Sequence, residues 1–216
     1  MKICCISDTH SQLNKIIVPS GDLLIHAGDL TFNGTTKETI KELDTLQKHS
    51  KNFQHIVLIS GNHDWLGEKQ PLLMKKLCED RGLIYLDHSS VKLLGFNIFG
   101  SPYTPEFYNW AFNVQRGEDI RKKWDQIPRD TDILVTHGPP HRILDWVDRD
   151  GSLHVGCEEL REVVEVIRPK LHIFGHIHCA YGEVYYGMDP TATYYINASS
   201  CSESYNPTNP PIVIDL

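Results

Sequence analysis

Short apolar runs rich in β-branched residues recur along this chain, and each is bounded by glycine, proline, asparagine or another turn-forming residue. Runs of this length suit buried β-strands better than buried helices. We expect strands at residues 3–7, 23–27, 56–60, 91–94, 96–100, 133–136, 171–175, 184–186, 194–197 and 212–214.

Segments with helical periodicity lie between several of these runs. Thr35 and Glu38 have capping-box spacing, Pro71 suits the first turn of a helix, and Pro169 ends the last helix. The four predicted helices cover residues 35–46, 71–82, 115–127 and 160–167. Strands mixed with helices early in the chain and clustered late predict a layered α/β fold with two packed sheets. Since no repeat or linker interrupts the chain, we expect one domain over 1–216.

Composition excludes several classes of protein. The net charge is −7 and no block of Lys or Arg occurs, so a polymeric nucleic acid is not an expected partner. The sequence has no apolar stretch of about 18 residues, so no membrane span is expected, and its start lacks the features of a secretory signal. Six cysteines without a C-x-x-C pair suggest reduced thiols. A cytoplasmic location is therefore the default expectation.

Side chains of the kind that bind metals follow five predicted strands at the point where each strand ends. The five clusters are Asp8-Thr9-His10, Gly28-Asp29, Gly61-Asn62-His63-Asp64, His137-Gly138 and His176-Ile177-His178. Any one of them also occurs by chance on surfaces and in turns. Loops that leave the carboxyl ends of strands in an α/β sheet meet in one crevice, however, and their glycines permit close approach of the backbone. Five clusters in order therefore predict a metal centre.

The ligand atoms offered by these clusters are oxygens and imidazole nitrogens, and they are too many for one ion. Two ions about 3.5–4 Å apart, bridged by a carboxylate, would use them all. The absence of thiolates argues against a structural zinc site. Manganese is the expected ion, with iron, zinc, cobalt or nickel as alternatives.

Together the motifs D-x-H, G-D, G-N-H-D, H-G and G-H-x-H resemble those of the calcineurin-like metallophosphoesterase superfamily. Segments such as "LLIHAGDLT", "TDILVTHGPP", "RPKLHIFGHIH" and "INASSC" are similar to its metallophosphoesterase-domain-containing branch, over nearly the whole chain. The resemblance implies a four-layered α-β-β-α sandwich with two mixed β-sheets. It also implies a metal-dependent phosphodiesterase that acts on small substrates, including cyclic nucleotides.

Carried over position by position, the resemblance assigns seven metal ligands. The first ion would be bound by Asp8, His10, Asp29 and His178. The second would be bound by Asp29, Asn62, His137 and His176, with Asp29 bridging the two. Every ligand position of the family pattern is filled, which speaks against a member that keeps the fold only as a binding surface.

Two such ions would polarise the phosphoryl oxygens, lower the pKa of a bridging water to give a hydroxide nucleophile, and favour in-line attack. The departing alkoxide needs a proton, and His63 is the candidate general acid. Asp64 is the candidate group that orients the His63 ring or raises its pKa. The alternative for His63 is a histidine that only hydrogen-bonds a ligand.

Contacts to the rest of the substrate are expected from the aromatic segment "SPYTPEFYNWAFN" and from arginines. Tyr103 and Trp110 are candidates for stacking on a nucleobase; the alternative is that the rings pack the loop onto the core. Arg116, Arg142 and Arg149 are candidate phosphate contacts, although a single arginine is more often a solvated surface charge.

The expected partner is a small phosphate ester, with nucleotides among the candidates. A phosphodiesterase is the favoured function; the alternatives are a phosphomonoesterase, including a protein phosphatase, and a non-catalytic interaction module. Protein phosphatases of this superfamily carry an arginine soon after the G-D motif, whereas here Leu30-Thr31-Phe32-Asn33 follows. The complete ligand set counts against the interaction module.

Overall fold

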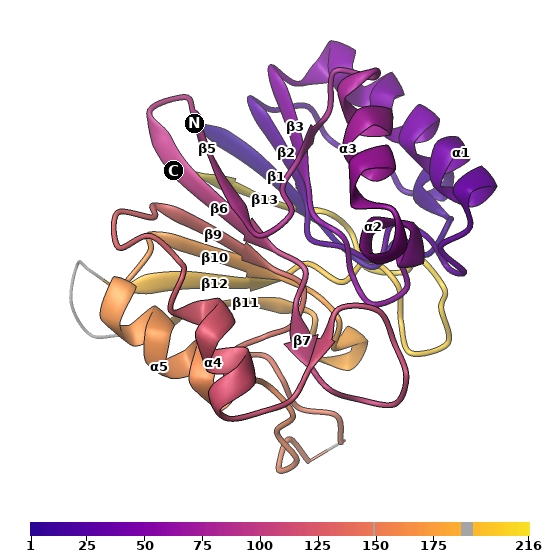
Figure 1. Ribbon diagram of the computed structural model, residues 1–216. Helices are drawn as coiled ribbons and strands as arrows, with labels where there is room; N and C mark the ends of the chain where they lie inside the picture. Colours follow the sequence, from indigo (N-terminus) through magenta and orange to yellow (C-terminus); the bar gives the residue numbers. More distant parts are fainter. Residues whose placement is uncertain (149, 187–191) are drawn as a thin grey trace.

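The computed structural model describes residues 1–148, 150–186 and 192–216, and these residues form four layers (Figure 1). Two β-sheets pack face to face, and helices cover the outer face of each sheet. One outer layer contains α1 (Thr36–Gln47), α2 (Trp65–Lys69) and α3 (Pro71–Glu79). The other contains α4 (Glu118–Trp124) and α5 (Glu158–Ile167). The predicted α-β-β-α sandwich is confirmed.

The first sheet contains the strands that carry three of the five ligand clusters. Its order is β13 (Ile212–Asp215), β1 (Lys2–Ile6), β2 (Leu23–His26), β3 (His55–Leu58) and β4 (Ile84–Tyr85). β1 to β4 run parallel, and β13 is antiparallel to β1. Ile6, His26 and Leu58 are paired in register, so the loops after β1, β2 and β3 start at the same height.

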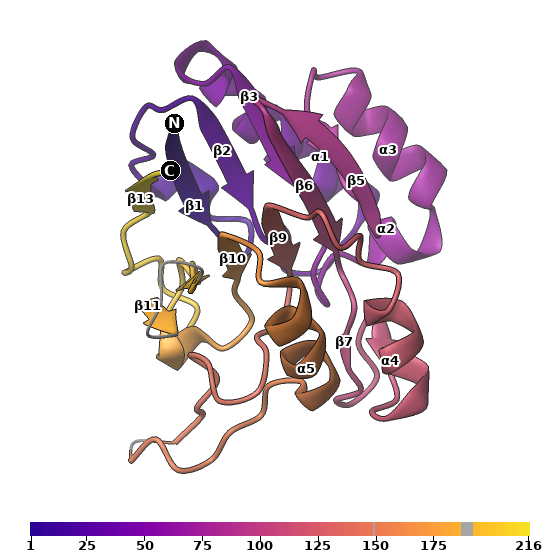
Figure 2. The ribbon, with the colours of Figure 1, turned by 90° about the vertical axis from the view of Figure 1, so that its left-hand side faces the viewer.

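The second sheet carries the other two clusters. Its order is β11 (Gly182–Tyr186), β12 (Thr193–Asn197), β10 (Leu171–Phe174), β9 (Ile133–Thr136), β6 (Phe96–Ser101) and β5 (Ser89–Leu93). The four inner strands are parallel and the two outer ones antiparallel to their neighbours. A bridge between Ser7, after β1, and Ser199, after β12, joins the two sheets where their loops leave. In Figure 2 the arrowheads of β1, β2 and β9 point toward this same end.

Side chains that point alternately to the two faces of each strand fill the spaces between the layers. In β1, Ile3 and Cys5 are buried between the two sheets, whereas Cys4 and Ile6 are buried with Leu43 of α1 on the helical side. β9 alternates in the same way between the inter-sheet core and the side covered by α4 and α5. Both faces of these strands are covered, which explains why the sequence shows continuous apolar runs.

Helix lengths depart from prediction where a glycine intervenes. The helix expected over 115–127 begins at Glu118, because Gly117 has a φ of 82°, outside the helical region. Its apolar face is nevertheless as expected, with Ile120 and Trp124 fully buried.

Several short elements were not predicted, because they have too few residues to show a period. They are α2, β4 and the ribbon formed by β7 (Thr104–Pro105) and β8 (Asn113–Val114). Within the described ranges, no helix has the length and apolar character needed to cross a bilayer.

Candidate metal centre

The loops after β1, β2, β3, β9 and β10 bring all seven predicted ligands together. In a first group, the Nε2 atoms of His10 and His178 lie 3.2 Å apart. Asp8 Oδ1 lies 4.0 Å from His10 Nε2 and 3.4 Å from His178 Nε2. Residues 168 positions apart in sequence thus point their donor atoms at one spot.

A second group lies on the other side of Asp29. Asp29 Oδ1 lies 3.4 Å from His137 Nε2, while Oδ2 of the same carboxylate lies 3.8 Å from His10 Nε2. Asn62 Oδ1 lies 2.9 Å from His137 Nε2, and the His176 ring faces the His137 ring with centroids 5.0 Å apart. The two oxygens of one carboxylate therefore face two different groups of ligands.

Backbone carbonyls orient two of the histidines. His137 Nδ1 lies 3.0 Å from the Ala27 carbonyl oxygen, and His178 Nδ1 lies 3.0 Å from that of Ser202. A carbonyl only accepts, so in both rings Nδ1 carries the proton and donates it. In both rings Nε2 is then the nitrogen that faces the carboxylates and is left to bind a metal.

The backbone at four ligands adopts the left-handed region that side chains rarely occupy. The φ values are 50° at Asp8, 41° at His10, 54° at Asp29 and 69° at His176. Non-glycine residues in this region carry backbone strain of roughly 1 kcal/mol or more, and they concentrate at functional sites. Hydrogen bonds from Asp8 N to Gly28 O, 2.9 Å, and from His10 N to Asp29 O, 3.1 Å, hold these turns.

Two glycines let the loops approach as closely as the ligand geometry requires. A Cβ added at Gly61 would overlap Asp29 Oδ1 and lie 2.5 Å from His137 Cε1. A Cβ at Gly175 would overlap Asp8 Oδ2 and Ser7 Oγ. Any other residue at these positions would displace a ligand carboxylate.

The buried carboxylates and histidines shift one another's pKa. Burial opposes ionisation of Asp8, but the hydrogen bond and charge of His178 outweigh it and hold the Asp8 pKa well below its usual range. Burial lowers the pKa of His137, but the neighbouring Asp29 carboxylate outweighs this effect and raises it to about 9. Asp29 in turn has a lowered pKa, because its own burial is outweighed by His137. The Asp29 carboxylate therefore stabilises the protonated form of His137.

The donor set fits divalent cations. Among the described residues, the candidate ligand atoms lie within 4.8 Å of one another in each of three groups: Asp8/His10/His178, Asp8/Asp29/His137 and His10/Asp29/His63. Imidazole nitrogens and carboxylate oxygens suit manganese, iron, zinc, cobalt and nickel. The third group was not expected, and it shows that the His63 ring lies close to the predicted ligands.

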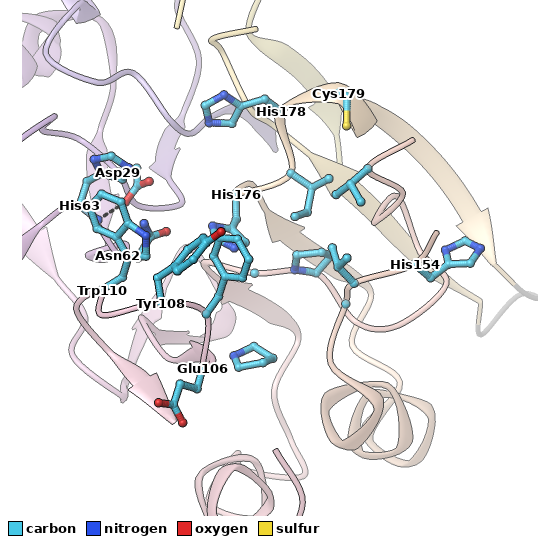
Figure 3. Close-up of a pocket in the computed structure, with 18 of the residues that line it drawn as sticks. Asp29, Asn62, His63, Glu106, Tyr108, Trp110, His154, His176, His178 and Cys179 are labelled. Carbon is cyan, nitrogen blue, oxygen red and sulfur yellow. Dashed lines mark hydrogen bonds between the residues drawn. The ribbon is translucent and has the colours of Figure 1, made fainter. Parts of the chain in front are cut away.

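His63 is held by a backbone carbonyl. Its Nδ1 lies 2.7 Å from the Phe32 oxygen, so Nδ1 donates and Nε2 is the nitrogen left to exchange a proton. The His63 backbone N–H donates to Asp29 Oδ1 at 2.8 Å, the dashed line in Figure 3. The Trp110 ring stacks on the imidazole, with centroids 4.4 Å apart and planes 29° apart.

The expectation that Asp64 orients the His63 ring is corrected, because the Asp64 carboxylate binds other groups. It accepts hydrogen bonds from the backbone N–H of Gly61 and Thr31, at 2.8 and 2.9 Å, and from the Thr31 hydroxyl at 2.6 Å. Asp64 thus ties the loop after β2 to the loop after β3. Burial, followed by the charge of Asp29, raises its pKa to about 6.

A cavity of about 870 Å³ opens in front of the ligands (Figure 3). Phe107, Tyr108 and Trp110 of the aromatic segment line it together with Asp29, Asn62, His63, His176 and His178. Tyr103, predicted as a substrate contact, does not line the cavity. It packs against Phe112, and the Lys123 ammonium lies 4.2 Å from its ring centroid. The segment therefore divides between cavity wall and core.

The three arginines predicted as phosphate contacts differ in their positions. Arg116 lines the cavity, but its guanidinium donates to the carbonyls of Gly156 and Val155 and to the Glu158 carboxylate, at 2.7–2.9 Å. Arg142 is exposed and is not among the lining residues, and Arg149 lies outside the described residues.

Sequence reasoning missed Ser199, although it lies in the quoted segment "INASSC". Ser199 Oγ lies 2.9 Å from Asp8 Oδ2 and 2.8 Å from Asn197 Oδ1. The Asn197 amide donates to the carbonyls of Leu144 and Ile177. Tyr205, also missed, places its ring edge-on to that of His10, 4.8 Å away. A serine or tyrosine far along the chain gives no spacing signal that connects it to the D-x-H motif.

The chain is similar to several known proteins. A family model described as calcineurin-like phosphoesterase matches residues 1–180. The human protein "Metallophosphoesterase domain-containing protein 1" is 41% identical over all of this chain and 71% of its own length. A more distant relative, the "Probable glycerophosphodiester phosphodiesterase GpdQ" of Arcobacter nitrofigilis, is 24% identical over 79% of this chain and 64% of its own. The solved structure of TT1561 of Thermus thermophilus shares the fold, with a TM-score of 0.57, 10% identity, and coverage of 91% of this chain and 88% of that one.

Proposed function

The chain belongs to the calcineurin-like phosphoesterase family of metal-dependent phosphoester hydrolases, and on that premise we propose that it hydrolyses small phosphodiesters, cyclic nucleotides among them. Two divalent cations would be held in a centre bridged by Asp29. Manganese is the ion that we expect, with iron, zinc, cobalt or nickel as alternatives.

The observation that carries the proposal is the position of the Asp29 carboxylate. One of its oxygens lies toward His137 and the other toward His10, at 3.4 and 3.8 Å. Asp8, His10 and His178 would complete one cation site with Asp29, and Asn62, His137 and His176 would complete the other. Bound there, two cations supply polarisation of the phosphoryl oxygens and activation of the attacking water.

His63 supplies the proton that the leaving alkoxide needs. Its Nδ1–H is committed to the Phe32 carbonyl, so the transferable proton is the one on Nε2. His63 is 5% exposed, and one of its ring nitrogens lies within 4.8 Å of ligand atoms of His10 and Asp29, which supports this role. General-acid catalysis of this kind typically contributes 10²–10⁴ in rate.

The charges of the cavity favour a diester over a monoester. A phosphate monoester carries two negative charges near neutral pH, whereas a diester carries one. Among the described residues that line the cavity, Arg116 is the one lysine or arginine, and its guanidinium is already bound to Glu158 and two carbonyls. A second substrate charge would therefore find no lysine or arginine in this wall that is not already bound to other groups. The name of the Arcobacter relative also fits a diester substrate.

The remaining expectations from the sequence stay predictions. They are a small-molecule substrate rather than a polymeric nucleic acid, and a cytoplasmic location.

A direct test compares bis-p-nitrophenyl phosphate with p-nitrophenyl phosphate, using protein purified without chelator and assayed with added manganese. We expect faster turnover of the diester, loss of activity with a chelator, and about two bound cations per chain by metal analysis. A panel of cyclic nucleotides would then narrow the substrate.

Each alternative predicts a different result in this assay. Faster turnover of the monoester would favour a phosphomonoesterase. Activity on neither ester, with a full metal content, would favour a non-catalytic interaction module. One bound cation in an active enzyme would contradict the bridging role of Asp29.

A further inference from the structure

We infer that Trp110 is a positioning residue that fixes the plane of the His63 ring and so aims Nε2 at the leaving oxygen; the inference rests on the proposed function. The ring of Trp110 lies parallel enough to that of His63 to stack, with centroids 4.4 Å and planes 29° apart (Figure 3). Because the indole covers one face of the imidazole, it limits rotation of the ring out of its plane.

A hydrogen bond at one nitrogen does not fix an imidazole ring by itself. The contact between Nδ1 and the Phe32 oxygen, 2.7 Å, anchors one atom, and the ring can still tilt about it. His10 meets the His63 ring at its edge, with centroids 4.7 Å and planes 78° apart. Trp110 on the face, His10 at the edge and the Phe32 carbonyl at Nδ1 each restrict the orientation of Nε2.

The segment that carries Trp110 is attached to the same loop that carries His63. The Ala111 N–H donates to the Asn62 carbonyl oxygen at 3.2 Å. The Phe112 N–H donates to Glu68 Oε1 at 2.7 Å, and Glu68 belongs to α2, the helix directly after the G-N-H-D motif. Ala111 is fully buried and Phe112 is 5% exposed. Two hydrogen bonds directly after Trp110 therefore hold its segment against the loop of His63 and the helix that follows it.

This geometry changes the role expected for Trp110. One face of Trp110 is occupied by His63, so only its other face is left for a nucleobase. The free rings of the same segment are Phe107 and Tyr108, which are 58% and 78% exposed. Phe107 and Tyr108 are therefore the rings of this segment most accessible to a substrate ring, and Trp110 orients the proton donor.

The test measures kcat on a series of aryl methyl phosphates whose phenols become less acidic, from p-nitrophenol to phenol. A positioned acid matters most for the poorest leaving group. We expect Trp110→Leu to change kcat by less than about twofold on the p-nitrophenyl ester and to lower it about tenfold on the phenyl ester. Trp110→Phe, which keeps a ring on the imidazole, should recover most of that loss.

A double-mutant cycle separates positioning from general damage to the fold. In a His63→Asn background, Trp110→Leu should lower kcat by less than about twofold on every ester, because the group that Trp110 positions is gone. Phe107→Leu is the matched control, because Phe107 lies in the same segment and lines the same cavity. Any change in kcat that it causes should be the same factor for every ester of the series.

Three results would overturn the inference. The first is that Trp110→Leu lowers kcat by the same factor on every ester, and the second is that its loss adds fully to that of His63→Asn. Either result leaves the phosphodiesterase proposal intact, because the wild-type enzyme is active on the series. The third is a metal-loaded wild-type protein that hydrolyses no member of the series, which would overturn both.

Discussion

The two sides of the cavity are held in different ways. On the ligand side, side chains are fixed by main-chain hydrogen bonds, as His137 is by Ala27 and His178 by Ser202, and several backbones are held in strained turns. On the aromatic side, Phe107 and Tyr108 are mostly exposed and contact each other, with ring centroids 4.4 Å apart. The ligand side is therefore preorganised, whereas the exposed rings of Phe107 and Tyr108 are free to change conformation when a substrate binds.

This difference assigns the reaction rate to the ligand side and the choice of substrate to the aromatic side. A preorganised ligand side acts on the phosphate that every substrate shares. The aromatic side contacts the part of the substrate that varies. Substitutions on the ligand side should therefore lower kcat for all esters, and those of Phe107 and Tyr108 should change KM for some of them.

Asp29→Asn should have the largest effect. Asparagine keeps one oxygen but loses the negative charge between the two ligand groups. Changes in groups that merely support ligands cost 10–100-fold, so loss of the shared ligand should lower kcat by at least about 100-fold. Metal analysis should show fewer than two cations per chain. Undiminished hydrolysis by this variant would remove the ligand side from the chemistry.

Ser199→Ala should have the next largest effect. The effect should arise through Asp8, a proposed metal ligand, rather than through contact between Ser199 and the metal. Removing the hydroxyl takes one of the hydrogen bonds from Asp8 Oδ2, which also accepts from the His176 N–H at 2.9 Å. We expect manganese affinity to fall by about 10–100-fold, with kcat at saturating manganese recovered. Titration of activity with manganese checks this. An unchanged titration midpoint would mean that Asp8 does not need this support.

The ligands could be predicted from sequence because each is encoded within a few residues of a strand end. Asp8 and His10 follow one apolar run, and His176 and His178 follow another. In-register parallel strands then bring the loops together without further information. The two packed sheets were predictable because the apolar runs that form their strands are also local in the sequence.

The groups that support the ligands could not be predicted in this way. Ser199 reaches Asp8 across 191 positions of sequence, and Phe32 holds His63 through a carbonyl, which every residue has. Asp64 sits next to His63 in sequence, yet its carboxylate faces Thr31 and Gly61. Adjacent residues in a turn point in different directions, so proximity in sequence misled the prediction.

The buried histidine His172 should make the stability of the fold sensitive to acid. His172 is fully buried in β10, and burial lowers its pKa to about 3. The folded state then binds fewer protons than the unfolded state below about pH 6.5, so stability present at pH 7 is lost as pH falls. For His172 alone the loss between pH 7 and pH 5 is about 2 kcal/mol.

The variant His172→Gln checks this sign and size. Denaturant unfolding of chelator-treated protein at pH 7 and pH 5 should give a pH-dependent loss smaller by about 2 kcal/mol in the variant. Glutamine can keep a hydrogen bond to the Thr136 hydroxyl, which lies 2.8 Å from His172 Nε2. Equal losses in both proteins would show that this histidine is protonated alike in the folded and unfolded states.

Phe107→Ala should have the smallest effect and the most selective one. Stacking on a base is worth about 1–3 kcal/mol per base, and the exposed position of Phe107 places its contribution at the lower end. We expect KM for a cyclic nucleotide to rise about fivefold, with kcat and metal content unchanged, and KM for a dialkyl phosphate to stay the same. Steady-state kinetics on both substrates measure this difference. Loss of kcat on both would show that the aromatic side takes part in the chemistry, so that rate and substrate choice are not divided between the two sides of the cavity.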